Sequence, residues 1–143
     1  MPHSMTAEDR LDILDLFARY AWAYDVGDAQ AYAEVFTEDG LLADESDLHA
    51  VGREAIRKAI QAFFDLRGPN VWQHHNAHLR MEGDGETCTV HSYWAVLEHR
   101  RDDDGYGVGS LGWYRSRCVR RDGVWRFAER TFYMDMPKVL PWT

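Results

Sequence analysis

The first half of the chain has apolar residues three and four positions apart, the spacing of one helix face. Thr6 with Asp9 predicts a capped start, and Gly27 predicts the end of a long, largely buried first helix. Asp28 can cap a short second helix, and Gly52 opens a third. The residues expected to face inward are Leu11, Leu14, Ala18, Ala21 and Asp25 on one stripe of the first helix, Ile13, Phe17, Tyr20 and Tyr24 on a second stripe, Tyr32, Ala33 and Phe36 in the second helix, and Ile56, Ile60, Phe63 and Phe64 in the third.

From Val71 onward the period changes from about 3.6 to 2, which predicts strands. Asp84-Gly85 and Asp122-Gly123 are typical hairpin turns, and a short strand is expected earlier, from Gly40 to Asp44. Three helices followed by an antiparallel meander predict an α+β domain whose helices cover one sheet face. We expect residues 1–143 to form a single domain, with 1–6 flexible.

The first hairpin defines two faces. If Asp84-Gly85 is a two-residue turn, His74 lies opposite Ala95 and His78 opposite His91. Alternation alone does not tell which face is inside. One face then carries Trp72, His74, Asn76, His78, His91, Tyr93, Ala95 and Leu97, and the other carries Val71, Gln73, His75, Ala77, Leu79, Cys88, Val90, Trp94 and Val96.

The charge balance limits the function classes. The chain has 16 Lys and Arg against 24 Asp and Glu, a net charge of −8, which argues against nucleic acid as a partner. No apolar run approaches the ~20 residues of a membrane span, and residues 1–5 do not resemble a signal peptide. We therefore expect a cytoplasmic protein without membrane partners. No Gly-rich phosphate loop or Gly-x-Ser-x-Gly motif is present, so no cofactor is predicted.

Asp25 and the histidines near residue 75 are the first candidates for chemistry. Asp25 continues a stripe that is otherwise Leu and Ala, so it either pairs with a buried partner or caps the helix end. His74, His78 and His91 could hold zinc with Asp25 if all four shared a face. Histidines on a sheet are more often hydrogen-bonded or exposed than ligated, so we predict no metal.

Two other groups of residues are ambiguous. Most arginines near the Asp122-Gly123 turn are typical of a solvated face, whereas Arg130 lies where the strand re-enters apolar sequence. The aromatic residues suit either a pocket for a hydrophobic or aromatic small molecule or an aromatic core. These aromatic residues include Trp22, Tyr24, Trp72, Tyr93, Trp113 and Tyr114.

Four strings give the chain a family resemblance from about Leu11 to Asp135. They are Tyr24-Asp25-x-x-Asp28, Gly52-Arg-Glu-Ala-Ile56, Gln73-His74 followed by Arg80, and Arg121-Asp-Gly-Val-Trp125-Arg-Phe127. Together they resemble the SnoaL-like branch of the nuclear transport factor 2-like superfamily, which includes scytalone dehydratase and hexachlorocyclohexane dehydrochlorinase. The resemblance implies a cone-shaped barrel, a strongly curved mixed, mostly antiparallel sheet with three N-terminal helices covering its concave face.

The resemblance also implies the site. In both enzymes an Asp and a His at the positions of Asp25 and His74 form a dyad inside the cone, which would put the His74 face inside. Tyr24 matches a catalytic tyrosine of scytalone dehydratase, and Arg130 matches an arginine of the dehydrochlorinase. The substrate-binding residues expected are Trp72, Tyr93, Ala95, Leu97, Ser110, Gly112, Tyr114, His78 and His91. The match requires a three-residue loop at 121–123, with Tyr114 opposite Arg130.

The expected function is a cofactor-independent lyase, of dehydratase or dehydrohalogenase type, acting on a small hydrophobic or aromatic molecule. His74 would be the base, Asp25 would hold its tautomer, and a tyrosine and Arg130 would stabilise a developing oxyanion. The alternatives are an isomerase, a polyketide-cyclase-like enzyme, or a non-catalytic subunit like the β subunits of ring-hydroxylating dioxygenases. A homo-oligomer, dimer or trimer, is also expected, because Val90, Trp94 and Val96 would need cover on the convex face.

Overall fold

The computed structural model describes residues 4–142, so the start of the expected flexible segment, residues 1–3, lies outside the described residues. Over the described range the chain forms three helices and one six-stranded sheet, which confirms the α+β class. The elements are α1 (Ala7–Val26), α2 (Ala29–Glu34), β1 (Phe36–Ala43), β2 (His49–Val51), α3 (Arg53–Arg67), β3 (Val71–Gly83), β4 (Thr87–His99), β5 (Tyr106–Arg121) and β6 (Val124–Met134).

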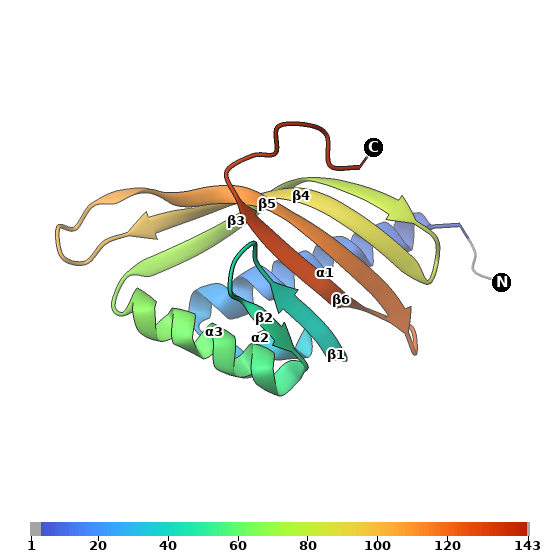
Figure 1. The fold of residues 1–143 in the computed structure, drawn as a ribbon, viewed down its shortest axis with the longest axis horizontal. Helices are drawn as coiled ribbons and strands as arrows, with labels where there is room; N and C mark the ends of the chain where they lie inside the picture. Colours follow the sequence, from blue (N-terminus) through green and yellow to red (C-terminus); the bar gives the residue numbers. More distant parts are fainter. Residues whose placement is uncertain (1–3, 143) are drawn as a thin grey trace.

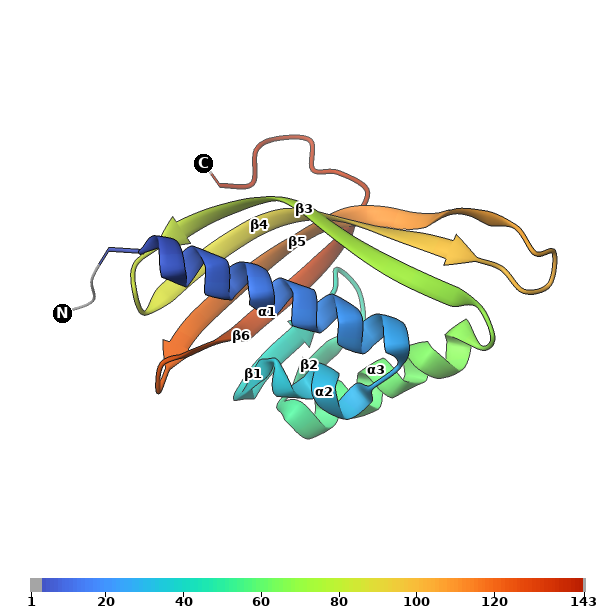
Figure 2. The same ribbon diagram turned by 180° about the vertical axis from the view of Figure 1, so that it is seen from behind.

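The strands lie in the order β2-β1-β6-β5-β4-β3. Neighbouring strands are antiparallel except β1 and β6, which run parallel. All three helices lie on one side of the sheet, and the C-terminal segment after β6 crosses the other side (Figures 1 and 2). We call the helix-covered side the inner face and the opposite side the outer face. The mixed, mostly antiparallel sheet with three covering helices is as predicted.

The ends of α1 are those the sequence predicts. The Thr6 hydroxyl accepts from the Asp9 N–H, and the Asp9 carboxylate accepts from the Thr6 N–H, both at 3.0 Å. Gly27 ends the helix in the left-handed region, with φ of 83°. The residues just before the helix are also anchored, since Ser4 forms a β-bridge with Asp84.

Two details of the helical half differ from expectation. The stripe containing Leu11, Leu14 and Ala18 is exposed, and α1 is buried mainly along the stripe of Ile13, Phe17 and Tyr20, joined by Leu16. Only the second stripe can pack against the sheet, because one side of α1 contacts the sheet while its opposite side is exposed to water. Phe36 is buried but begins β1 rather than continuing α2, which ends at Glu34.

The predicted register of the β3–β4 hairpin is wrong. The Asp84 N–H donates to the Thr87 carbonyl at 2.9 Å, so the tight turn contains Gly85 and Glu86, one residue later than predicted. A β-bulge near His78, whose φ is 53°, shifts the pairing again. Beyond the bulge, His74 lies opposite Val96 rather than Ala95.

This register decides which β4 residues face inward. Side chains alternate along a strand, so a shift of one residue exchanges the two faces. Trp94 and Val96 share the inner face with His74, and Val90 is also buried there. None of the three therefore lies on the outer face, where another subunit was expected to cover them. The bulge also lets Leu79 pack on the core.

The β5–β6 hairpin also differs from prediction, but here the residues expected to face inward still do so. Arg121 pairs with Val124, so the loop is the two-residue turn Asp122-Gly123, with φ of 53° and 77°, and not a three-residue loop. A second bulge then inserts Ala128 into β6. It restores the alternation, and Tyr114 and Arg130 share the inner face although they are not directly opposed.

The core lies between the inner face and the helices. Ile13 and Leu16 of α1, Ile56 of α3 and Phe127 of β6 are fully buried there. None of the helices in the described part of the chain is long and apolar enough to span a membrane. The helices leave part of the inner face uncovered by packed side chains, and this gap holds the candidate site.

Candidate active site

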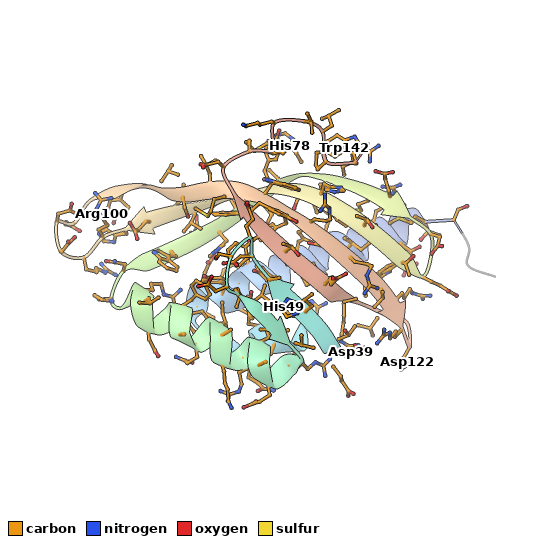
Figure 3. All side chains as sticks on the ribbon, viewed as in Figure 1. Asp39, His49, His78, Arg100, Asp122 and Trp142 are labelled. Carbon is orange, nitrogen blue, oxygen red and sulfur yellow. The ribbon has the colours of Figure 1, made fainter. Side chains whose placement is uncertain are left out.

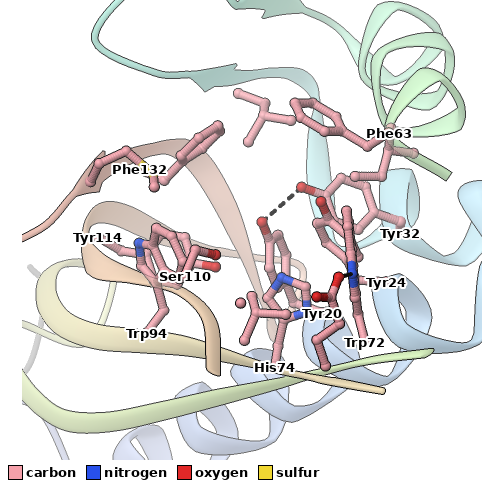
Figure 4. A pocket seen from close by; sticks show the side chains of 16 residues that line it. Tyr20, Tyr24, Tyr32, Phe63, Trp72, His74, Trp94, Ser110, Tyr114 and Phe132 are labelled. Atoms are coloured by element: carbon pink, nitrogen blue, oxygen red, sulfur yellow. Dashed lines mark hydrogen bonds between the residues drawn. The ribbon is translucent and has the colours of Figure 1, made fainter. Parts of the chain in front are cut away.

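A cavity of about 250 Å³ lies between the inner face of the sheet and the helices (Figure 4). Most of its wall is aromatic or aliphatic, so polar groups inside it interact in a medium of low dielectric constant. The aromatic residues that line it are Tyr20, Tyr24, Tyr32, Phe63, Trp72, Trp94, Tyr114 and Phe132. The polar or charged residues of the wall other than tyrosine are His74, Glu98 and Ser110.

Asp25 holds His74 at this wall through two hydrogen bonds. The carboxylate accepts from ring Nδ1 at 2.6 Å and from the backbone N–H of His74 at 2.8 Å. Because Nδ1 carries the donated proton, a neutral ring has Nε2 as its free acceptor. The pair therefore presents a positioned base to the cavity, with a carboxylate behind it to stabilise the protonated ring.

The end of α1 that carries Asp25 is itself secured by α3. Arg67 Nη1 donates to the carbonyl oxygens of Tyr24 at 3.0 Å and of Asp25 at 3.3 Å, satisfying carbonyls that the helix end leaves free. Gly27 has to be a glycine here, because its φ is 83° and an added Cβ would lie 3.0 Å from Arg67 Nη2. Asp25 is thus both at a helix end and in the dyad.

Four tyrosine hydroxyl groups surround the cavity. The Tyr24 ring lies 4.0 Å from the His74 ring, centroid to centroid, and the Tyr32 hydroxyl donates to the Tyr20 hydroxyl at 2.8 Å (Figure 4). Burial raises the pKa of Tyr20, Tyr24, Tyr32 and Tyr114. All four phenols therefore stay protonated and can act as hydrogen-bond donors.

Arg130 lies behind the tyrosines and does not line the cavity. It is fully buried, and its guanidinium carbon is 3.6 Å from the Tyr114 ring centroid and 4.1 Å from that of Tyr20. Its Nη2 donates to Asn76 Oδ1 at 3.4 Å, while Nε and Nη1 have no hydrogen-bond partner among the described residues. Aromatic faces stabilise its charge, and that charge opposes the rise in the pKa of Tyr20 and Tyr114.

Comparison with known proteins gives the family. The model of the SnoaL-like domain matches residues 5–131, most of the chain. The chain belongs to the SnoaL-like domain family. No match was found among curated proteins.

Solved structures with this SnoaL-like fold include several bacterial proteins. A Catenulispora acidiphila protein in complex with S-DNPA is 30% identical, with a TM-score of 0.82, covering 91% of this chain and 96% of that one. A variant of Rv3472 from Mycobacterium tuberculosis, a protein of unknown function, is 29% identical, with a TM-score of 0.81 and coverage of 91% and 73%. A candidate scytalone dehydratase from Novosphingobium aromaticivorans, 21% identical, shares the fold with a TM-score of 0.76 and coverage of 90% and 85%.

The cavity of this SnoaL-like domain contains part of the predicted site. Tyr24, Trp72, His74, Ser110 and Tyr114 line it. Asp25 lies behind His74, and Arg130 lies behind Tyr20 and Tyr114.

Gly112, which was expected to bind substrate, does not line the cavity. An added Cβ at this position would clash with the carbonyl oxygen of Tyr133 and would lie 2.7 Å from the Trp94 indole, so the glycine makes room for both groups. Its contribution to the site is therefore indirect.

Five residues expected in the pocket lie elsewhere, because the bulge near His78 changes the pairing of β3 with β4. Tyr93 lines a hollow beneath the C-terminal segment together with His78 and His91, and Leu97 lines a groove formed by the outer face. Ala95 alternates with Trp94 and Val96 and so faces outward.

The histidines considered as zinc ligands do not converge. His78 lies on the outer face near the C-terminal segment that carries Trp142 (Figure 3). His74, by contrast, lines the cavity on the inner face. His91 Nε2 accepts from Arg115 Nε at 3.2 Å. Among the described residues, no three side chains of His, Cys, Asp or Glu gather as metal ligands would.

The surroundings of His91 are cationic and aromatic. Its ring lies 5.6 Å from the Trp142 ring, centroid to centroid. Burial, with the charges of Arg115 and Arg80, lowers the pKa of His91. His91 therefore stays neutral at neutral pH and takes no part in the cavity.

Sequence reasoning missed several residues of the cavity wall. Tyr20 and Tyr32 were expected to face inward but only as core, and their helical spacing with Tyr24 was the available signal. Trp94, Val96 and Glu98 were missed because a bulge cannot be read from alternation. Glu98 is the most consequential of these, since it places a carboxylate where Leu97 was expected.

Proposed function

We propose that this SnoaL-like domain is a cofactor-independent lyase, of dehydratase or dehydrohalogenase type, acting on a small hydrophobic or aromatic molecule. The observation that carries the proposal is the 2.6 Å hydrogen bond between Asp25 and His74 at the wall of an aromatic cavity. An imidazole oriented by a carboxylate, at the wall of an aromatic cavity, suits abstraction of a proton next to a carbonyl group.

Loss of a hydroxyl group needs two proton transfers, and loss of a halide needs only the first. His74 Nε2 takes the proton from the carbon next to the carbonyl, and Asp25 stabilises the imidazolium that forms. The electron pair of the broken C–H bond first moves into an enolate, and it then forms the new carbon–carbon double bond as the bond to the leaving group breaks. A leaving hydroxyl departs as water after receiving a proton from the imidazolium, whereas a halide departs as the anion.

The tyrosine hydroxyls supply the second part of the chemistry. A carbonyl oxygen gains negative charge as the proton leaves, and a neutral phenol can donate a hydrogen bond to it. Tyr24, Tyr20 and Tyr114 line the cavity, and the raised pKa of each keeps it a donor. Arg130 would act through the rings of Tyr20 and Tyr114 rather than on the substrate.

An isomerase or a polyketide-cyclase-like enzyme would use the same machinery. If the imidazolium returns its proton to another substrate carbon, the product is an isomer, and if the enolate attacks a carbonyl, it is a ring. The Catenulispora acidiphila protein was solved in complex with S-DNPA, which supports a ligand-binding role for this domain as well.

The test compares His74→Ala with His75→Ala, its neighbour on the same strand. His75 is exposed and forms a hydrogen bond with the Gln73 side chain, so it serves as a matched control. Against a panel of β-hydroxy and β-halo ketones followed by the absorbance of the enone product, His74→Ala should lose about 10²–10⁴-fold in kcat/KM. An equal effect of the two substitutions would contradict the role of His74.

We also propose a homo-oligomer, formed through the outer face. Large apolar side chains are exposed there, including Tyr93 on β4 and Val139 and Leu140 in the C-terminal segment. Apolar patches of this kind usually mark a protein interface. Light scattering after size exclusion should give the mass of a dimer or trimer. A monomer, or a chain stable only with a second protein, would favour the accessory-subunit alternative.

A further inference from the structure

Glu98 introduces a carboxylate into a largely aromatic and aliphatic wall. It is half-buried at the end of β4 and lines the cavity. Its Oε2 accepts a hydrogen bond from Trp72 Nε1 at 2.8 Å, and it forms no ion pair with any residue that the structure describes. The Trp72 hydrogen bond needs only a neutral acceptor, so it does not explain why a charged group stands here.

The backbone opposite Glu98 leaves its side chain room. Gly107 is its partner on β5, and Gly109 lies close by. A Cβ added to Gly109 would lie 3.5 Å from Glu98 Cβ and 3.8 Å from Cδ, so the space above this glycine is where the Glu98 side chain extends. Gly109 also lines the cavity, and because it has no side chain the Glu98 side chain fits beside it at the cavity wall.

Glu98 and His74 lie at neighbouring positions of the same wall. Trp72 pairs with Glu98, and His74 pairs with Val96, so Glu98 is a diagonal neighbour of His74 across the two strands. Diagonal neighbours in an antiparallel pair are roughly 7–8 Å apart. One small ring can therefore reach both side chains, with its reacting carbon at His74 and another substituent at Glu98.

We propose that Glu98 determines the specificity of this cavity, binding ligands through an ammonium or hydroxyl group and disfavouring ligands with a carboxylate. The inference rests on the proposed function in taking the ligand of this cavity as the substrate. A carboxylate without a cationic partner loses solvation on burial, and a donor on the ligand compensates that loss. A ligand carboxylate would instead meet the charge of Glu98, with the charge of Asp25 behind His74.

The experiment measures binding rather than turnover. Three probes that share one ring system, 2-naphthylmethylammonium, 2-naphthylmethanol and 2-naphthoate, are titrated by calorimetry at pH 7.5 into the wild type, Glu98→Gln and Glu129→Gln. The glutamine keeps the shape of Glu98 and an acceptor for Trp72. Glu129 pairs with Arg117 on an exposed part of the sheet, so its variant controls for the loss of one charge far from the cavity.

The wild type should bind the ammonium probe most tightly and the carboxylate probe most weakly. In Glu98→Gln the ratio of the two Kd values should change by about tenfold, the effect of one charge-assisted hydrogen bond, while Glu129→Gln leaves it unchanged. An unchanged ratio in Glu98→Gln, or a wild type that binds the three probes equally or not at all, would overturn the proposal. His74→Ala should keep the order of affinities, so a failure of the lyase proposal alone is distinguishable.

Discussion

Two Asp–His pairs in this protein have the same contact distance and different surroundings. Asp25 with His74 and Asp104 with His99 are each joined by 2.6 Å between a carboxylate oxygen and a ring nitrogen. In the first pair the His and Asp side chains are 5% and 17% exposed, and in the second 11% and 86%. The first pair connects α1 to β3, whereas the second lies within the β4–β5 hairpin, where His99 also stacks on Tyr106.

The difference shows that contact distance does not identify a catalytic pair. Water competes for Asp104, and the hairpin would place its carboxylate near His99 in any fold that kept this loop. Asp25 is held at the helix end, accepts a second hydrogen bond from the His74 backbone, and orients a histidine that lines an aromatic cavity. Burial and the second hydrogen bond make this pair a rigid base for a ligand.

The largest expected difference between the pairs is in activity. Asp25→Asn should lower kcat/KM by at least about 10²-fold, because the amide no longer stabilises the imidazolium. Asp104→Asn should leave it within about twofold, because His99 lies outside the cavity. Steady-state kinetics on the same enone-forming substrate measures both, and comparable losses would show that the buried pair has no special role in activity.

The second difference is in stability. Asp25→Ala leaves the His74 backbone N–H without its acceptor in a partly buried position, which should lower the free energy of unfolding by about 1–3 kcal/mol. Asp104→Ala removes an exposed pair, and we expect less than about 1 kcal/mol. Urea unfolding followed by tryptophan fluorescence provides both values, and an Asp25→Ala variant as stable as the wild type would show that water replaces the carboxylate.

A third histidine sharpens the comparison, because cations surround it instead of a carboxylate. Burial and the charges of Arg115 and Arg80 lower the pKa of His91 below its unfolded value. Between these two pKa values the unfolded chain binds more protons, so stability is lost as the pH falls from about 6.5 through the folded pKa.

We expect the Tm of the wild type to fall more between pH 7.5 and 5.5 than the Tm of His91→Gln, which does not titrate at this position. This effect is the smallest of the three. Differential scanning fluorimetry over this range measures it, with His75→Gln as the exposed control. A parallel pH dependence of wild type and His91→Gln would mean that His91 contributes nothing to acid sensitivity.

Local signals predicted the helical half well. Thr6 with Asp9, Gly27 and Asp28 mark helix ends through hydrogen bonds that span three or four residues, so the sequence contains the information. The inward stripe of α1 was harder to predict, because two adjacent stripes are apolar and only contact with the sheet distinguishes Ile13 from Leu14.

The two hairpins show where sequence reasoning stops. Each contains a bulge that the alternation of polar and apolar residues does not reveal, one at His78 and one at Ala128. The first bulge changed which β4 residues face the cavity and brought in Glu98. The second put Tyr114 and Arg130 on the same face, although they are not directly opposed as predicted. A bulge forms where the core requires even-numbered residues to face inward on one side of it and odd-numbered residues on the other. That requirement comes from contacts with segments distant in the sequence.

The sequence by itself determined the helix ends, the class of fold, the family resemblance, and Asp25 and His74 as residues to bring together. Only the tertiary structure decided that these two are in contact, that four tyrosines surround the cavity, that Arg130 stands behind them, and that Glu98 rather than Leu97 completes the wall. The reason is physical. Caps and turns depend on neighbours within a few residues, whereas the cavity is formed by segments that meet only when α1 packs against β3 and the bulges set the strand registers.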